Sequence, residues 1–200
     1  MLLRFASFLL LIVLGLANPA LAQSRLDVGA MGSSIDLAPY LQQLTTEKPE
    51  VMVELPRDAT GKVGVIALKS SRSVPSYHWR ILTLVNTGKI PKNLIVVIDH
   101  QKFAGSRLLY PLNPGSVVAS IAHTGSVAPA RISALGQDAY SLVLEPSANL
   151  SLGLEMTGTA PSALLWERDA FDSLSRSIAF FRGAILGVAV LLSVSMLLLH

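Results

Sequence analysis

The stretch Leu150–Met156 has the sequence LSLGLEM, in which large apolar residues alternate with Ser151, Gly153 and Glu155. Successive side chains of a β-strand point to opposite faces of its sheet. The pattern therefore predicts a strand with one face in an apolar core and the other face in water.

Outward from this strand, the surrounding residues also have β character. The run Leu94–Ile98 is apolar at every position, which predicts a strand buried on both faces. Prolines, glycines and asparagines interrupt residues 23–167 at short intervals and leave little room for a long helix. Further runs with strand-like composition lie at Val63–Leu68, His78–Asn86, Asn93–His100, Ser116–Ala122 and Asp138–Glu145. The acidic stretch Glu47–Asp58 is interpreted as a solvated loop. We therefore expect residues 23–167 to form a mainly β domain, a jelly-roll-like β-sandwich.

Residues 1–22 have the layout of a secretory signal peptide. Arg4 precedes an apolar run, and the small residues Ala20 and Ala22 follow it. Cleavage is predicted before Gln23, which places the following domain outside the cytoplasm. The alternative is an uncleaved N-terminal anchor, but the apolar run is short for a hydrocarbon core of about 30 Å.

The C-terminal segment has a different pattern. From Asp169 onward, apolar residues recur at spacings of three and four, and residues 183–199 contain no charge. No proline separates the two parts, so Asp169–Leu199 is predicted to be one continuous helix of about 46 Å. It comprises a juxtamembrane part, residues 168–182, and a membrane-spanning part, residues 183–200. The chain is interpreted as the front part of a longer protein, cut inside its first membrane helix; the alternative is a complete protein with a C-terminal anchor.

Aromatic and basic residues mark the expected passage into the membrane. Trp166 precedes the helix, and Phe181, Arg182 and Gly183 lie where the uncharged run begins. Tryptophan is favoured at the boundary between membrane and water. We therefore expect the helix to lie in a membrane, with residues 23–179 on its outer side.

The sequence offers little for catalysis, metal binding or nucleic-acid binding. It has no cysteine, and its four histidines lack the spacing that would hold a metal ion from one element. Asp99 and His100 are adjacent but point to opposite faces of a strand. Without Arg4 and Arg182, 14 basic residues stand against 13 acidic ones, so the charge does not indicate nucleic-acid binding. We therefore expect no enzymatic activity, cofactor, metal site or nucleic-acid partner for this chain.

The stretch Tyr77–Arg80, with the sequence YHWR, is the best candidate for ligand binding. Aromatic faces and guanidinium groups are common in carbohydrate and carboxylate recognition. Tyr77, Trp79 and Arg80 are therefore predicted to bind a ligand. The alternative is structural: a core tryptophan beside a strand arginine that pairs with an acidic residue.

A series of short motifs resembles a family of envelope sensors. The motifs are Ile35–Tyr40 (IDLAPY), Trp79-Arg80 followed by Leu84–Asn86 (LVN), Leu165–Glu167 (LWE) and Phe181–Gly183 (FRG). In this order they resemble the bacterial seven-transmembrane receptors with diverse intracellular signalling modules, especially the alphaproteobacterial sensor diguanylate cyclases. The resemblance implies a periplasmic jelly-roll domain, a membrane region and a cytoplasmic output that makes or relays a signal such as cyclic di-GMP. It also implies that the Trp-Arg…Asn pattern is structural, marking a central strand and its turn.

The first functional hypothesis is a sensor input module. The sandwich would bind a small molecule, a carbohydrate or a periplasmic protein, and the predicted helix would carry the change inward. By analogy with sensors of this layout, the chain would form a homodimer. The alternative is a membrane-tethered carbohydrate-binding or envelope-assembly module. A third hypothesis, an anchored periplasmic hydrolase, lacks a nucleophile or carboxylate pair in the sequence. A signalling domain encoded beyond His200 favours the sensor, and a stop codon there favours the tether.

Overall fold

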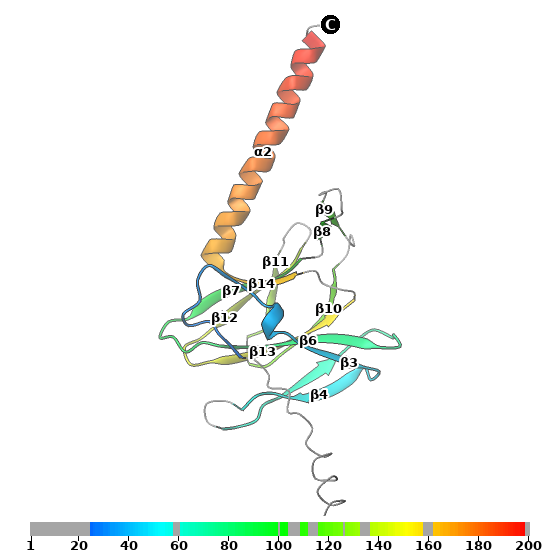
Figure 1. Ribbon diagram of the computed structural model, residues 1–200, viewed down its shortest axis with the longest axis vertical. Coiled ribbons are helices and arrows are strands. Elements are labelled where there is room, and N and C mark those ends of the chain that lie inside the picture. Colours follow the sequence, from blue (N-terminus) through cyan, green and yellow to red (C-terminus); the bar gives the residue numbers. More distant parts are fainter. Residues whose placement is uncertain are drawn as a thin grey trace, which may run out of the picture.

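The computed structural model describes residues 25–57, 61–99, 101–103, 109–111, 116–125, 127–132, 137–157 and 162–198. Within these residues the chain is mostly β-strand, and a long α-helix stands at its C-terminal end (Figure 1). The mainly β fold class is thereby confirmed. The predicted signal peptide, residues 1–22, and its cleavage site at Ala20, Ala22 and Gln23 lie outside the described residues.

The described strands form two five-stranded sheets, here called sheet A and sheet B. Sheet A contains β1 (Arg25–Asp27), β3 (Gln42–Thr46), β6 (Tyr77–Val85), β10 (Val118–His123) and β13 (Asn149–Met156). β6 lies at its centre and pairs along its whole length with β13. On its other edge, β6 pairs with β3 near its beginning and with β1 near its end.

Sheet B has the strand order β11-β12-β7-β14-β2. Its strands are β2 (Ser34–Asp36), β7 (Lys92–Asp99), β11 (Ala130–Ile132), β12 (Gln137–Leu144) and β14 (Ser162–Glu167). The chain passes from one sheet to the other between β6 and β7, between β12 and β13, and between β13 and β14. This alternation gives the sandwich its jelly-roll-like connectivity. Two short elements complete the outline: the 3-10 helix η1 (Ala38–Tyr40), and the pair β8 (Gln101–Phe103) and β9 (Leu109–Pro111).

The turn between β6 and β7 is fixed by Asn86, whose side chain is fully buried. Its Nδ2 group donates hydrogen bonds to the carbonyl oxygens of Ile90, at 2.9 Å, and Leu144, at 3.0 Å. Its Oδ1 atom accepts a hydrogen bond of 3.0 Å from the N–H group of Gly88. Asn86 therefore has a structural role, which joins the start of β7 to the end of β12.

The main core lies between the inner faces of the two sheets. Sheet A contributes Leu82, Leu84, Leu152 and Leu154, and sheet B contributes Leu94, Val96, Ile98, Leu142 and Leu165. Burying a side chain of this size contributes about 1.5–3 kcal/mol. This cluster holds the two sheets together in a chain that has no cysteine to form a disulfide.

The expectation of a water-exposed face on β13 is wrong, because the outer face of sheet A is covered. Every residue of β13 after Asn149 is buried. The cover is a hairpin of β4 (Glu50–Glu54) and β5 (Val65–Lys69), which buries Leu68 and Trp79 in a second apolar cluster. Gly153 allows the close approach, since a Cβ atom there would lie 2.3 Å from Cδ2 of Leu68.

The polar residues on this covered face of β13 are buried together with partners from distant parts of the chain. Oγ of Ser151 and Oγ1 of Thr83 share a hydrogen bond of 2.9 Å. One carboxylate oxygen of Glu155 lies 3.4 Å from Nη1 of Arg72. Buried polar groups are usually paired in this way, but the second carboxylate oxygen of Glu155 is buried without a hydrogen-bond partner among the described residues.

The interpretation of Glu47–Asp58 as a solvated loop is also wrong, because this stretch contains β4. Val53 packs against the cluster beneath the hairpin, whereas Met52 faces outward and is 68% exposed. Pairing with β5 and burial of one face outweigh the high acidic content of the stretch.

The helix α2 (Arg168–Leu198) follows β14 directly. It agrees with the predicted helix Asp169–Leu199, and about 46 Å separate its ends. Its first turn packs on the outer face of sheet B, where Phe171 is buried against Ile95, Val97 and Ala139. Beyond this turn the helix projects away from the sandwich, while the β4 strand lies on the opposite side of the molecule (Figure 1). A stretch of 18 residues within α2 has a mean hydropathy of 2.1, so the helix is long and apolar enough to cross a membrane.

Candidate functional site

The predicted ligand-binding residues lie on both faces of β6. Tyr77 and Trp79 point toward the hairpin and are buried in the cluster beneath it. The hydroxyl group of Tyr77 donates a hydrogen bond of 3.1 Å to the carbonyl oxygen of Arg72. Arg80 is only partly buried and belongs to the opposite face, because successive side chains alternate. The structure therefore places Arg80 on the face of β6 opposite to the two aromatic residues.

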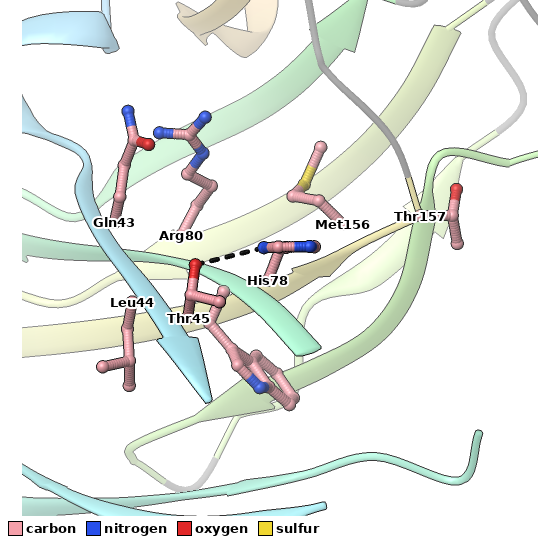
Figure 2. A pocket seen from close by; sticks show the side chains of 8 residues that line it. Gln43, Leu44, Thr45, His78, Arg80, Met156 and Thr157 are labelled. Atoms are coloured by element: carbon pink, nitrogen blue, oxygen red, sulfur yellow. Dashed lines mark hydrogen bonds between the residues drawn. The ribbon is translucent and has the colours of Figure 1, made fainter. Parts of the chain in front are cut away.

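Arg80 lines a hollow of about 380 Å³ at the end of the sandwich, here called the end hollow. Its walls come from β3, β6, the last residue of β13 and the residue after it: Gln43, Leu44, Thr45, His78, Trp79, Arg80, Met156 and Thr157. Strand pairing explains the arrangement, because Gln43 is the partner of Arg80 across β3 and β6. Figure 2 shows these two side chains next to each other and pointing in the same direction.

A hydrogen bond orders the middle of the end hollow. Nδ1 of His78 lies 3.1 Å from Oγ1 of Thr45 on the neighbouring strand (Figure 2). Nε2 of His78 lies 3.4 Å from Oγ of Ser76. Thr45 and His78 are cross-strand partners, so the pairing of β3 with β6 holds them in register.

A smaller hollow of about 170 Å³, here called the inner hollow, adjoins the end hollow and shares Gln43, Arg80 and Met156 with it. Its remaining walls come from η1, the loop after it and both sheets: Ala38, Leu41, Ile98, Leu154, Ser162 and Ala163. The inner hollow is thus lined by residues of both sheets and is continuous in its lining with the end hollow. Arg80 lies where they meet.

The charge of Arg80 dominates this site. Among the described residues its guanidinium group has no hydrogen-bond or ion-pair partner. Burial lowers the pKa of Arg80 below its ordinary value, although an arginine stays protonated at neutral pH. Among the described residues that line the two hollows, none is acidic. The structural alternative, an arginine paired with an acid, therefore finds no partner in the described part of the chain.

The side chains that line the two hollows offer several polar groups to a ligand. Hydroxyl, amide and guanidinium groups surround an apolar interior, which is typical of sites that recognise a ligand. Across the described residues, no group of three or more histidine, aspartate or glutamate side chains lies close enough to hold a metal ion. The sequence identified Arg80 but missed Gln43 and Thr45, since β3 has no clear alternation of apolar and polar residues.

A third hollow, of about 340 Å³, lies on the outer face of sheet A, beside the end of the hairpin; we call it the side hollow. Arg25, Thr83 and Ser151 are among its lining residues. It has no residue in common with the end hollow or the inner hollow. Arg25 in the side hollow can therefore serve as a control for Arg80, because it is an arginine in a different hollow.

The residues predicted to mark the passage into the membrane lie far apart along the chain. Trp166 is in β14 and packs, partly buried, against the cluster that contains Phe171. Phe181, Arg182 and Gly183 lie on the exposed part of α2. Arg182 follows the start of α2 by 14 residues, or about 21 Å. Trp166 is thus a contact of the sandwich with its helix, at a distance from the uncharged run.

Comparison with known proteins gives no relative. No protein-family model matches the chain, no curated protein matches it and no solved structure matches it. The resemblance to seven-transmembrane receptors therefore stays a prediction, and the function has to be argued from the hollow, the strand β14 and the helix α2.

Proposed function

We propose that this protein is the ligand-binding input module of a membrane-bound signalling protein. The sandwich lies in the periplasm and takes up a ligand in the end hollow and the inner hollow. The helix α2 crosses the inner membrane and passes a conformational change to a cytoplasmic output, for which a diguanylate cyclase is the expected class. One observation carries the proposal: the strand that lines the inner hollow continues directly into α2.

The path from the hollow to the helix is short. Ser162 and Ala163, the first residues of β14, line the inner hollow. Glu167, the last residue of β14, is followed immediately by Arg168, the first residue of α2. The six residues of β14 span about 20 Å. A strand of this length, paired on both sides, transmits a displacement better than a flexible linker does.

Three contacts attach the junction to sheet B. Lys92 in β7, which is largely buried, forms an ion pair with the partly exposed Glu167. Nη1 of Arg168 donates a hydrogen bond of 3.0 Å to Oγ of Ser141 in β12. Phe171 inserts into the outer cluster one turn later. A change in the position of β14 or of sheet B is therefore passed to the first turn of α2.

The ligand position links both sheets. Arg80 and Gln43 belong to sheet A, whereas Ser162 and Ala163 belong to sheet B. A ligand that contacts all four depends on the spacing between the sheets, so it binds more tightly to one spacing than to another. A difference of about 1–3 kcal/mol between two states is the usual scale of such coupling.

The proposal is tested by measuring the position of α2 relative to sheet A. Because the chain has no cysteine, the double variant Ala67→Cys/Ser177→Cys takes spin labels at those two positions. Ala67 lies on the exposed side of β5, and Ser177 lies on α2 before the uncharged run. In lipid nanodiscs, a small-molecule extract of a bacterial periplasm is expected to shift the distance between the labels.

Two controls make this result specific. Labels at Ala67→Cys and Glu47→Cys, both outside sheet B and α2, should keep their distance unchanged. Adding Ser175→Pro, which breaks α2 before the second label, should abolish the shift while the sandwich stays folded. An extract that raises the melting temperature of the sandwich but leaves the Ala67–Ser177 distance unchanged would contradict the proposed coupling.

A further inference from the structure

The chemistry of the two connected hollows indicates what class of ligand they accept. Arg80 is the one described side chain with a permanent charge in their lining. A single guanidinium group without an acidic partner in a partly buried position favours a ligand with one negative charge.

The surroundings of Arg80 supply further hydrogen-bond donors at the mouth. Gln43 lies next to Arg80 in the lining of the end hollow, and its side-chain amide carries no charge (Figure 2). An anion bound to the guanidinium fork can therefore accept additional hydrogen bonds from an amide or a hydroxyl group.

The inner hollow has an apolar patch beside its polar residues Gln43, Arg80 and Ser162. Leu41, Ile98, Leu154, Met156 and Ala163 line the inner hollow, and Ile98 and Leu154 are almost completely buried. A polyhydroxylated ligand would lose hydrogen bonds to water here without gaining partners. A short hydrocarbon chain would instead gain from leaving water.

We infer that the two hollows bind a monocarboxylate with a short branched or linear hydrocarbon chain. The carboxylate pairs with the guanidinium group of Arg80 at the junction of the hollows, and the chain enters the inner hollow between the sheets. The inference rests on the proposed function and specifies the ligand of that site. The hydrocarbon chain then contacts Ala163 of β14, and this contact links binding to the strand that continues into α2.

The test compares two molecules of the same shape. The full chain in nanodiscs is equilibrated by dialysis against radiolabelled 3-methylbutanoate or its neutral amide, with empty nanodiscs as the blank. We expect the acid to bind about ten- to a hundredfold more tightly than the amide, since a hydrogen-bonded charge pair is lost in the amide. Equal binding of acid and amide, or tighter binding of inorganic phosphate than of the acid, would overturn the inference.

Variants assign the charge to Arg80. Arg80→Gln should reduce binding of the acid to the level of the amide, and Arg80→Lys should give an intermediate affinity because it keeps the charge but loses the fork. The matched control is Arg25→Gln, which removes an arginine from the side hollow and should leave binding unchanged. Loss of binding in Arg25→Gln but not in Arg80→Gln would refute the site. If Arg80→Gln does not fold, Arg80→Lys and the acid–amide comparison decide the question.

This outcome is separable from that of the proposed function. If the acid binds through Arg80 but the Ala67–Ser177 distance stays unchanged, the ligand class is supported and the coupling fails. If a periplasmic extract shifts the distance while the acid does not bind, the coupling is supported and the ligand class is wrong.

Discussion

The sandwich has a cover on each outer face, and the two covers differ greatly in extent. On sheet A, a complete hairpin buries Leu68, Trp79 and Ile81 in an apolar cluster. On sheet B, the cover described by the structure is the first turn of α2, where Phe171 is the buried residue of the helix. The hairpin is thus an integral part of the core, whereas the helix contact is small enough to change without unfolding the sheets.

The largest effect is expected from the hairpin side. Trp79 is 1% exposed, and Trp79→Ala should reduce the free energy of unfolding by about 3–5 kcal/mol, because it leaves a cavity between hairpin and sheet. Thermal unfolding followed by circular dichroism measures the loss. The matched control is Met52→Ala on the exposed side of the same hairpin, which should have almost no effect. A loss no larger for Trp79→Ala than for the control would show that the hairpin is not part of the core.

On the helix side, Phe171→Ala should reduce the free energy of unfolding by about 3 kcal/mol, since Phe171 is 9% exposed in a smaller cluster. The more informative result is expected in the label experiment. Without the Phe171 side chain, the distribution of distances between the labels at positions 67 and 177 should become broader while the sandwich remains folded. Phe180→Ala, at an exposed position of the same helix, is the control. A narrow distribution in Phe171→Ala would mean that other contacts fix the helix.

The smallest effect is expected where the hairpin touches β13 most closely. Gly153→Ala places a Cβ atom against Leu68, and such overpacking costs about 2 kcal/mol. Because the clash involves one side chain, the double variant Gly153→Ala/Leu68→Ala should lose less stability than the sum of the single variants. Exact additivity in this cycle would indicate that the hairpin lies farther from the sheet than the structure has it.

Much of the fold could be predicted from local patterns. The strands β6, β7, β12 and β13 and the helix α2 follow runs whose composition or periodicity is visible in the sequence. The predictions that were wrong concern residues whose partners lie far away in the sequence. The covered face of β13 looks polar in sequence. Ser151, however, is paired with Thr83, which lies 68 positions earlier in the chain, and Glu155 with Arg72, which lies 83 positions earlier. Such pairings leave no periodic trace.

The candidate site was predictable only in part for the same reason. Arg80 stands out as a charged residue beside aromatic residues, and the structure places it at the junction of two hollows. Because side chains alternate along β6, Trp79 is buried in the core while its neighbour Arg80 points to the other face. Their adjacency in the sequence does not reveal this difference. Gln43 and Ser162 come to the site through pairing of β3 and β14 with strands far away in sequence. Their contribution follows from the topology and not from any motif.

The direct junction between Glu167 and Arg168 also fixes the rotation of α2 about its own axis. An α-helix turns by about 100° and advances 1.5 Å with each residue. One inserted residue at the junction would therefore swing every downstream side chain more than a quarter of a turn about the axis, with the sandwich untouched. Sheet B thus fixes the rotation of the whole helix about its axis. The number of residues between β14 and α2 therefore determines which side of the helix faces a neighbouring molecule.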